Sequence, residues 1–127
     1  MTTAEQPGGK APSDTVAVPD KSAAHNLSAA LDQLWVKFLP EIRLRVETLD
    51  AAVAACAANE LSAAQREAAH AAAHKLAGTL GTFNLGHGTE LAREFELLVS
   101  KEAFPDSSVA GRLTSLAASL RTIVEGR

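Results

Sequence analysis

His74 is the residue whose type and surroundings are best suited to chemistry. It lies in the run Ala73-His74-Lys75-Leu76-Ala77-Gly78-Thr79-Leu80-Gly81. On an α-helix each residue advances by about 100°, which places Leu76, Leu80 and Phe83 on the side opposite His74. The imidazole is therefore expected to face water or a partner, where a neutral ring is a good nucleophile.

The residues expected beside His74 on the helix are small or polar. Those within about 60° of it on a helical projection are Glu67, His70, Ala71, Ala77, Gly78 and Gly81. Each glycine inside a helix costs about 1 kcal/mol relative to alanine, so fold stability alone would not select two of them. We infer that Gly78 and Gly81 leave room beside the ring.

His74 has no companion for hydrolytic catalysis in its own sequence neighbourhood. No serine or cysteine pairs with it in a known local motif, and no acid at helical spacing is placed to orient it. Glu67 lies two turns earlier, about 10.5 Å along the axis. A histidine of this kind suits the acceptance of a phosphoryl group from a partner, because catalysis of phosphoryl transfer consists mostly of positioning, metal binding and charge stabilisation.

Three other interpretations of this region compete with that one. His74 could be an ordinary surface histidine. His70 and His74 share a face and could bind zinc or copper, but Ala71 stands where a His-Glu-x-x-His motif has its glutamate, so no metal site is predicted. Ala77, Gly78 and Gly81 could be a strip for close helix packing in a homodimer, although a monomer is expected.

Composition restricts the fold to one helical domain. The chain has 127 residues, of which 46% are hydrophobic, with much alanine, no tyrosine and too little valine and isoleucine for several strands, a composition that favours closely packed helices. The single cysteine, Cys56, excludes an internal disulfide and a cysteine-based zinc site. A net charge of −3 argues against nucleic acid binding. No apolar run is long enough to span a membrane, and a cytoplasmic location is expected.

Periodicity predicts a tail followed by five helices. Residues 1–20 are rich in Pro, Gly and polar residues and are expected to be a disordered tail; residues 21–127 are expected to form the domain. The first helix ends at Leu39, and Pro40 opens the second. The apolar stripes of the five segments are Leu27, Leu31, Leu34, Trp35 and Phe38; Ile42, Val46, Leu49, Val53 and Cys56; Leu76, Leu80 and Phe83; Leu91, Phe95 and Leu98; and Val109, Leu113, Leu116, Leu120 and Ile123.

The connections between these segments predict an up-and-down arrangement. Ser62 and Gln65 form a capping-box pattern that opens the helix of His74, and Asn84, Gly86 and Gly88 mark the turn after it. Short connections favour antiparallel neighbours. The last four helices are therefore expected to form an antiparallel four-helix bundle, with the additional N-terminal helix packing across one end.

The run around His74 also resembles a known family. His74-Lys75-Leu76-Ala77-Gly78, followed by Gly81 and the amphipathic segment Leu91-Ala92-Arg93-Glu94-Phe95-Glu96, looks like the signature of a histidine-containing phosphotransfer (HPt) domain. That signature has a histidine, a lysine three places later and a glycine four places later. The resemblance covers residues from about 26 to 125, and its specific part is the run around His74.

The resemblance implies a role for each matched position. His74 would be the phosphoacceptor, Gly78 the small residue that keeps its ring accessible, and Gly81 an extension of that clearing. Ala77 replaces the usual lysine, and Lys75 would partly substitute for it beside the phosphoryl group. Glu67, His70, Ala71, Ala77 and Gly81 would contribute to partner docking.

The implied function is a phosphorelay intermediate without kinase or phosphatase activity of its own. Its partners would be a response-regulator receiver domain, a sensor histidine kinase or both, and the receiver would supply Mg²⁺, so no cofactor of its own is expected. One alternative is a bundle that docks receivers without transfer. Another, the dimerisation helix pair of a histidine kinase, fits less well because Lys75 follows the histidine where that class has an acidic residue.

Overall fold

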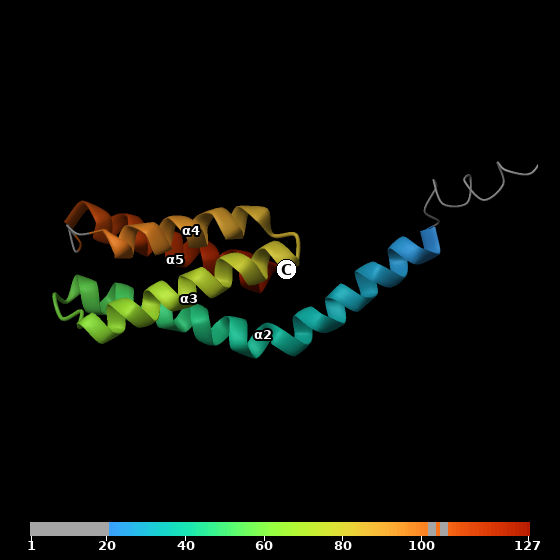
Figure 1. The fold of residues 1–127 in the computed structure, drawn as a ribbon, viewed down its shortest axis with the longest axis horizontal. Helices are drawn as coiled ribbons and strands as arrows, with labels where there is room; N and C mark the ends of the chain where they lie inside the picture. The colour runs from blue at the N-terminus through green and yellow to red at the C-terminus, as the bar shows by residue number, and fades with distance from the viewer. Residues whose placement is uncertain (1–20, 102–103, 105–106) are drawn as a thin grey trace, which may run out of the picture. The chain divides into compact units, whose positions relative to one another are not determined.

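The computed structural model describes residues 21–101, 104 and 107–127. This part of the chain contains four α-helices and no strand: α2 (Lys21–Ala57), α3 (Ala63–Thr82), α4 (Gly86–Ser100) and α5 (Ser107–Gly126) (Figure 1). The all-α prediction is confirmed. The chain divides into two units, Met1–Val36 and Lys37–Arg127. The predicted disordered tail, residues 1–20, lies outside the described residues.

The described residues of the range 37–127 form an antiparallel four-helix bundle. The C-terminal part of α2, then α3, α4 and α5 run alternately in opposite directions (Figure 1). Each connection within the described residues is short: Ala58–Ser62 between α2 and α3, and Phe83–Leu85 between α3 and α4. Short connections allow only neighbouring, antiparallel helices, as the sequence predicts.

The bundle core comes from one apolar face of each helix. After Pro40 these faces follow the predicted stripes, because spacings of three and four residues keep side chains on one side of a helix. The stripe predicted before Pro40 is not a buried face: Trp35 is buried, but Leu27, Leu34 and Phe38 are exposed. Phe95 is the largest fully buried side chain. The other large core residues are Ile42, Val46 and Leu49 of α2, Leu76 and Leu80 of α3, Val99 of α4, and Leu113, Leu116, Leu120 and Val124 of α5.

Pro40 does not end a helix, contrary to the sequence-based prediction. α2 continues through it from Lys21 to Ala57. An interior proline removes one backbone hydrogen bond and costs about 3 kcal/mol or more, but burial of Ile42, Val46 and Leu49 stabilises the helix after it. Two predicted helices are therefore one. Packing of an additional helix across one end of the bundle is not confirmed.

Helices α3 and α4 approach each other closely near their connection. Asn84 adopts a left-handed conformation with φ of 62°, and the Leu85 N–H donates to the Leu80 carbonyl at 2.9 Å. Gly88 belongs to α4 rather than to the turn, and a Cβ added there would lie 2.9 Å from Leu80 Cδ1. A side chain at this position would require the buried Leu80 side chain to move.

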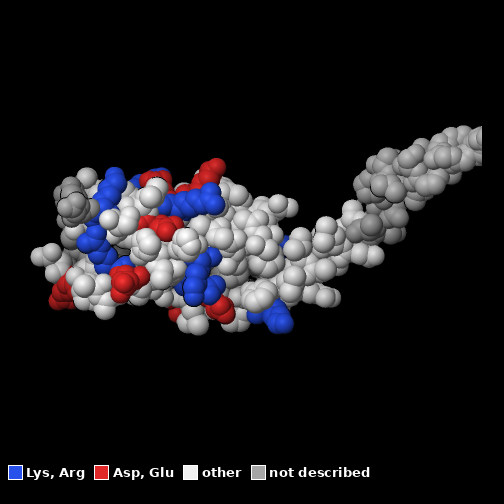
Figure 2. Space-filling model, in the orientation of Figure 1, with Lys and Arg blue, Asp and Glu red and all other residues white. Residues whose placement is uncertain are grey.

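Ion pairs join α5 to both of its neighbours. Arg43 of α2 donates two hydrogen bonds to Glu125, at 2.9 and 2.7 Å. Arg121 also pairs with Asp50 of α2, and Arg112 donates to both carboxylate oxygens of Glu94 on α4, at 2.6 and 2.7 Å. Figure 2 shows acidic and basic side chains interspersed on the visible face of the bundle. No described helix is long and apolar enough to cross a membrane.

Candidate functional site

Helix α3 presents His74 to solvent. The predicted capping box forms: the Gln65 N–H donates to Ser62 Oγ at 3.0 Å, and the Ser62 N–H donates to Gln65 Oε1 at 2.9 Å. From that start, Ala69, Ala73, Leu76 and Leu80 face the core. The His74 side chain is 72% exposed. Its expected exposure is confirmed.

Glu96 of α4 orients the imidazole of His74. Its Oε2 lies 2.9 Å from His74 Nδ1, and its side chain is 20% exposed. An ionised carboxylate can only accept hydrogen bonds, so Nδ1 carries the proton and donates it. The lone pair of the neutral ring is then on Nε2. The arrangement holds a nucleophilic nitrogen on a ring that is exposed to a partner.

Sequence analysis missed Glu96, although a signal for it was present. His74 lies ten residues before Asn84, and Glu96 lies twelve residues after it. In two antiparallel helices joined by a tight turn, residues at similar distances from the turn are neighbours. Thr89 and Ala77 obey the same relation, since the Thr89 hydroxyl donates to the Ala77 carbonyl at 2.8 Å. Searching only along the helix of His74 could not reveal a partner on α4.

His70 shares the carboxylate of Glu96. Its Nε2 lies 3.5 Å from Glu96 Oε2, and its side chain is 43% exposed. The closer contact belongs to His74, so Glu96 primarily orients that ring. Among the described residues, no group of three His, Cys, Asp or Glu side chains has the arrangement of a metal site.

A hollow of about 340 Å³ lies beside His74. It is lined by His74, Ala77, Gly78, Arg93, Glu96 and Leu97. A Cβ added to Gly78 would meet no atom within 4 Å, so the absent side chain leaves free space at the edge of this hollow. A Cβ added to Gly81 would lie 3.3 Å from Thr89 Oγ1, which connects Gly81 with the close approach of α4 as well.

The other predicted docking residues differ in their solvent exposure. Glu67, Ala71 and Gly81 are exposed, as expected. Ala77 is only 5% exposed, contrary to its expected place on the open face, because α4 packs against that flank of α3. Lys75 is exposed, but it does not line the hollow beside His74.

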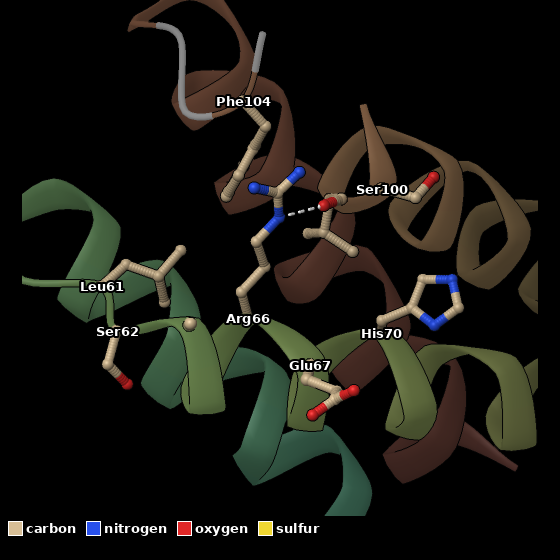
Figure 3. Close-up of a pocket in the computed structure, with 9 residues that line it drawn as sticks. Leu61, Ser62, Arg66, Glu67, His70, Ser100 and Phe104 are labelled. Atoms are coloured by element: carbon tan, nitrogen blue, oxygen red, sulfur yellow. Dashed lines mark hydrogen bonds between the residues drawn. The ribbon is translucent and has the colours of Figure 1, made fainter. Parts of the chain in front are cut away.

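A larger hollow, of about 610 Å³, lies nearer the N-terminus of α3 (Figure 3). Arg66 crosses it and donates to the Val99 carbonyl at 2.6 Å and to the Lys101 carbonyl at 2.5 Å. Its guanidinium also lies 4.9 Å from the centroid of the Phe104 ring. Arg66 thus supplies hydrogen bonds and positive charge at the C-terminal end of α4, where helix carbonyls lack partners.

The match to a protein family agrees with this geometry. A family model described as the Hpt domain matches residues 33–125, a range that contains α3 and α4, most of α2 and all but the last residue of α5. The chain belongs to the Hpt domain family. Comparisons with curated proteins and with solved structures found no match.

Membership of this family defines the general activity. Hpt domains carry phosphoryl groups on histidine in two-component phosphorelays, and they interact with receiver domains and histidine kinases. They are intermediates of phosphotransfer and not autonomous enzymes. The resemblance found around His74 is confirmed at the level of the family.

Proposed function

We propose that His74 is the phosphoacceptor and that its partner is the aspartyl phosphate of a receiver domain. The observation that carries this proposal is the exposed ring of His74, whose Nδ1 is held 2.9 Å from Glu96 Oε2. Nucleophilic attack needs a free lone pair on a nitrogen that another protein can reach. Nε2 meets both requirements.

The transfer step needs no additional base, because no proton has to be removed from the attacking nitrogen. The Nε2 lone pair attacks phosphorus, the bond from phosphorus to the aspartate oxygen breaks, and the aspartate leaves as a carboxylate. The ring retains its proton on Nδ1 and becomes cationic, and the Glu96 carboxylate offsets that charge. In the reverse direction, an aspartate of a receiver attacks phosphorus and the electrons of the N–P bond return to Nε2.

The partner would supply the remaining catalytic groups. Mg²⁺ bound by the receiver would neutralise phosphoryl oxygens, as metal ions do in phosphoryl transfer generally. The open position at Gly78 supports the approach of such a partner. Glu67, His70, Ala71 and Gly81 would contribute docking surface around the site, and a sensor kinase could use the same face.

The decisive experiment is transfer from receiver domains. A panel of receivers labelled with ³²P on aspartate is mixed with the protein in the presence of Mg²⁺. Label that is acid-labile and base-stable identifies phosphohistidine, and the His74→Gln variant is expected to acquire none. Binding of receivers without label would instead favour the docking function, for which the replacement of the usual lysine by Ala77 is the supporting observation.

A further inference from the structure

Arg93 forms part of the wall of the hollow beside His74. It projects from α4 and lines the same 340 Å³ space as His74, Gly78 and Glu96. Arg93 precedes Glu96 by three residues, a spacing that puts both side chains on one face of α4. The helix that orients the imidazole therefore also brings a cation to it.

The side chain of Arg93 is free, unlike those of the other arginines in the bundle interfaces. Within the described part of the chain it makes no hydrogen bond or ion pair, and it is exposed. By contrast, Arg43, Arg112 and Arg121 pair with carboxylates, and Arg66 donates to backbone carbonyls. Glu96, the acid in the same hollow, is occupied by His74. Among the residues that the structure describes, no carboxylate pairs with the Arg93 guanidinium.

Position 77 offers no substitute for this charge. Ala77 is buried where α3 meets α4, and its carbonyl accepts the hydroxyl of Thr89. Lys75 lies about 100° around the helix from His74 and outside the lining of the hollow. A phosphoryl group on Nε2 would add negative charge close to the Glu96 carboxylate. A cation of this protein near Nε2 would offset that charge whether or not a partner's Mg²⁺ is present.

We propose that Arg93 binds the phosphoryl oxygens during transfer to and from His74. This inference rests on the proposed function of His74 and identifies the residue that neutralises the transferred group. A guanidinium suits the task because its planar N–H groups can donate two parallel hydrogen bonds to phosphate oxygens. Arg93 forms and breaks no covalent bond; it offsets charge as the bond from phosphorus to Nε2 forms.

A chemical phosphoryl donor tests this role without a protein partner. Phosphoramidate transfers its phosphoryl group to Nε2 with release of ammonia, so the rate of His74 phosphorylation can be followed by ³¹P NMR. Arg93→Ala is expected to slow this reaction about tenfold, which is a typical effect of losing one charge-assisted hydrogen bond. Arg93→Lys should restore part of the rate, and His74→Gln reports any labelling of other histidines.

Lys37→Ala is the control, since it removes an exposed cation on α2, a helix that does not line the hollow beside His74. It should leave the rate within about twofold of the parent protein. Added salt should slow the parent protein more than Arg93→Ala, because salt screens the charge that this variant lacks. A structural role alone would not produce this difference.

The possible results distinguish the role of Arg93 from the proposed transfer between receiver domains and His74. An unchanged rate in Arg93→Ala, or an equally slow Lys37→Ala, would overturn the role of Arg93 even if receivers transfer label to His74. Conversely, an Arg93-dependent reaction with phosphoramidate would support it even if no receiver in a panel transfers label. The receiver experiment with Arg93→Ala then measures the same fold-change in the protein-to-protein reaction.

Discussion

Glu96 Oε2 and His74 Nδ1 lie 2.9 Å apart, although 22 residues separate them in the chain. The contact joins two helices whose relative position is set by the turn at Asn84 and by the hydrogen bond from Thr89 to Ala77. A histidine on an isolated helix would rotate freely about its side-chain bonds. In this bundle the neighbouring helix selects the protonated nitrogen and leaves the other one available.

Loss of Glu96 is therefore expected to impair transfer more than folding. Glu96→Ala removes the acceptor from Nδ1, so the ring populates both neutral tautomers and several orientations. The rate of phosphorylation should fall about 10- to 100-fold, as it does when other oriented imidazoles lose their partners. Transfer kinetics measure the rate, and ¹⁵N NMR of the His74 ring measures the tautomers.

Glu94→Gln is the control for this variant, because Glu94 lies on the same helix and pairs with Arg112 instead. Its transfer rate should remain close to that of the parent protein. Equal rates in Glu96→Ala and the parent would contradict an orienting role for Glu96. A loss of helical circular dichroism in Glu96→Ala would instead assign the defect to folding.

The sequence predicts burial or exposure correctly for residues whose environment is set by their position on their own helix. The exposure of His74 and the burial of Leu76 and Leu80 follow from helical periodicity, and the capping box at Ser62 predicts where α3 begins. These features need no knowledge of the neighbouring helices. The roles of His74 and Gly78 in transfer stay predictions.

Features that depend on the contact between α3 and α4 could not be predicted in the same way. Ala77 was expected among the accessible residues beside His74, but α4 covers it. Glu96 and Arg93 were not expected there, but α4 brings both to the hollow beside His74. A helical projection cannot show how far the neighbouring helix extends over each flank. The predicted break at Pro40 failed for a related reason, because packing of the following residues can outweigh a local preference.

Gly88 is expected to be essential for the approach of α4 to α3. Leucine at this position would place a Cβ within 2.9 Å of Leu80 Cδ1 and 3.4 Å of Ile123 Cγ2, and the Leu80 side chain is fully buried. Gly88→Leu should therefore lower the free energy of unfolding by about 1–3 kcal/mol or more. Urea titration measures the change, and a stability equal to that of the parent would show that the core adjusts freely.

The pKa values of two carboxylates, Glu94 and Glu125, determine how the stability of the bundle should change in acid. Hydrogen bonds from Arg112 and from Arg43 lower the pKa values of Glu94 and Glu125, respectively. A lowered pKa in the folded state adds stability at pH values above the unfolded value, about 4.3, and this stability is lost as the pH falls through the folded pKa. The contribution is small because both side chains are exposed.

The variants Glu94→Gln and Glu125→Gln should accordingly lose stability at pH 7 and differ little from the parent at pH 2. Urea unfolding at both pH values measures this dependence. Glu60→Gln, a change at an exposed residue between α2 and α3, should show no such difference. A larger deficit at pH 2 than at pH 7 would contradict the sign derived from the lowered pKa values.

Gly78 is expected to lower the free energy of unfolding while keeping the His74 ring accessible. Its Cβ position is empty, so Gly78→Leu should fit without a clash and raise the free energy of unfolding by up to about 1 kcal/mol, since leucine is a better helix former. The added side chain would occupy the space beside the imidazole. Transfer from a receiver domain should then be blocked while the fold becomes more stable.

Gly111 provides the matched control because it is exposed on α5 and a Cβ there also meets no atom within 4 Å. Gly111→Leu should raise the thermal midpoint by a similar amount but leave transfer unchanged, since it lies on a helix that does not contribute to the hollow beside His74. Thermal unfolding and transfer kinetics on both variants separate helix propensity from access. If Gly78→Leu transferred as fast as Gly111→Leu, the space beside His74 would have no role in admitting a partner's active site.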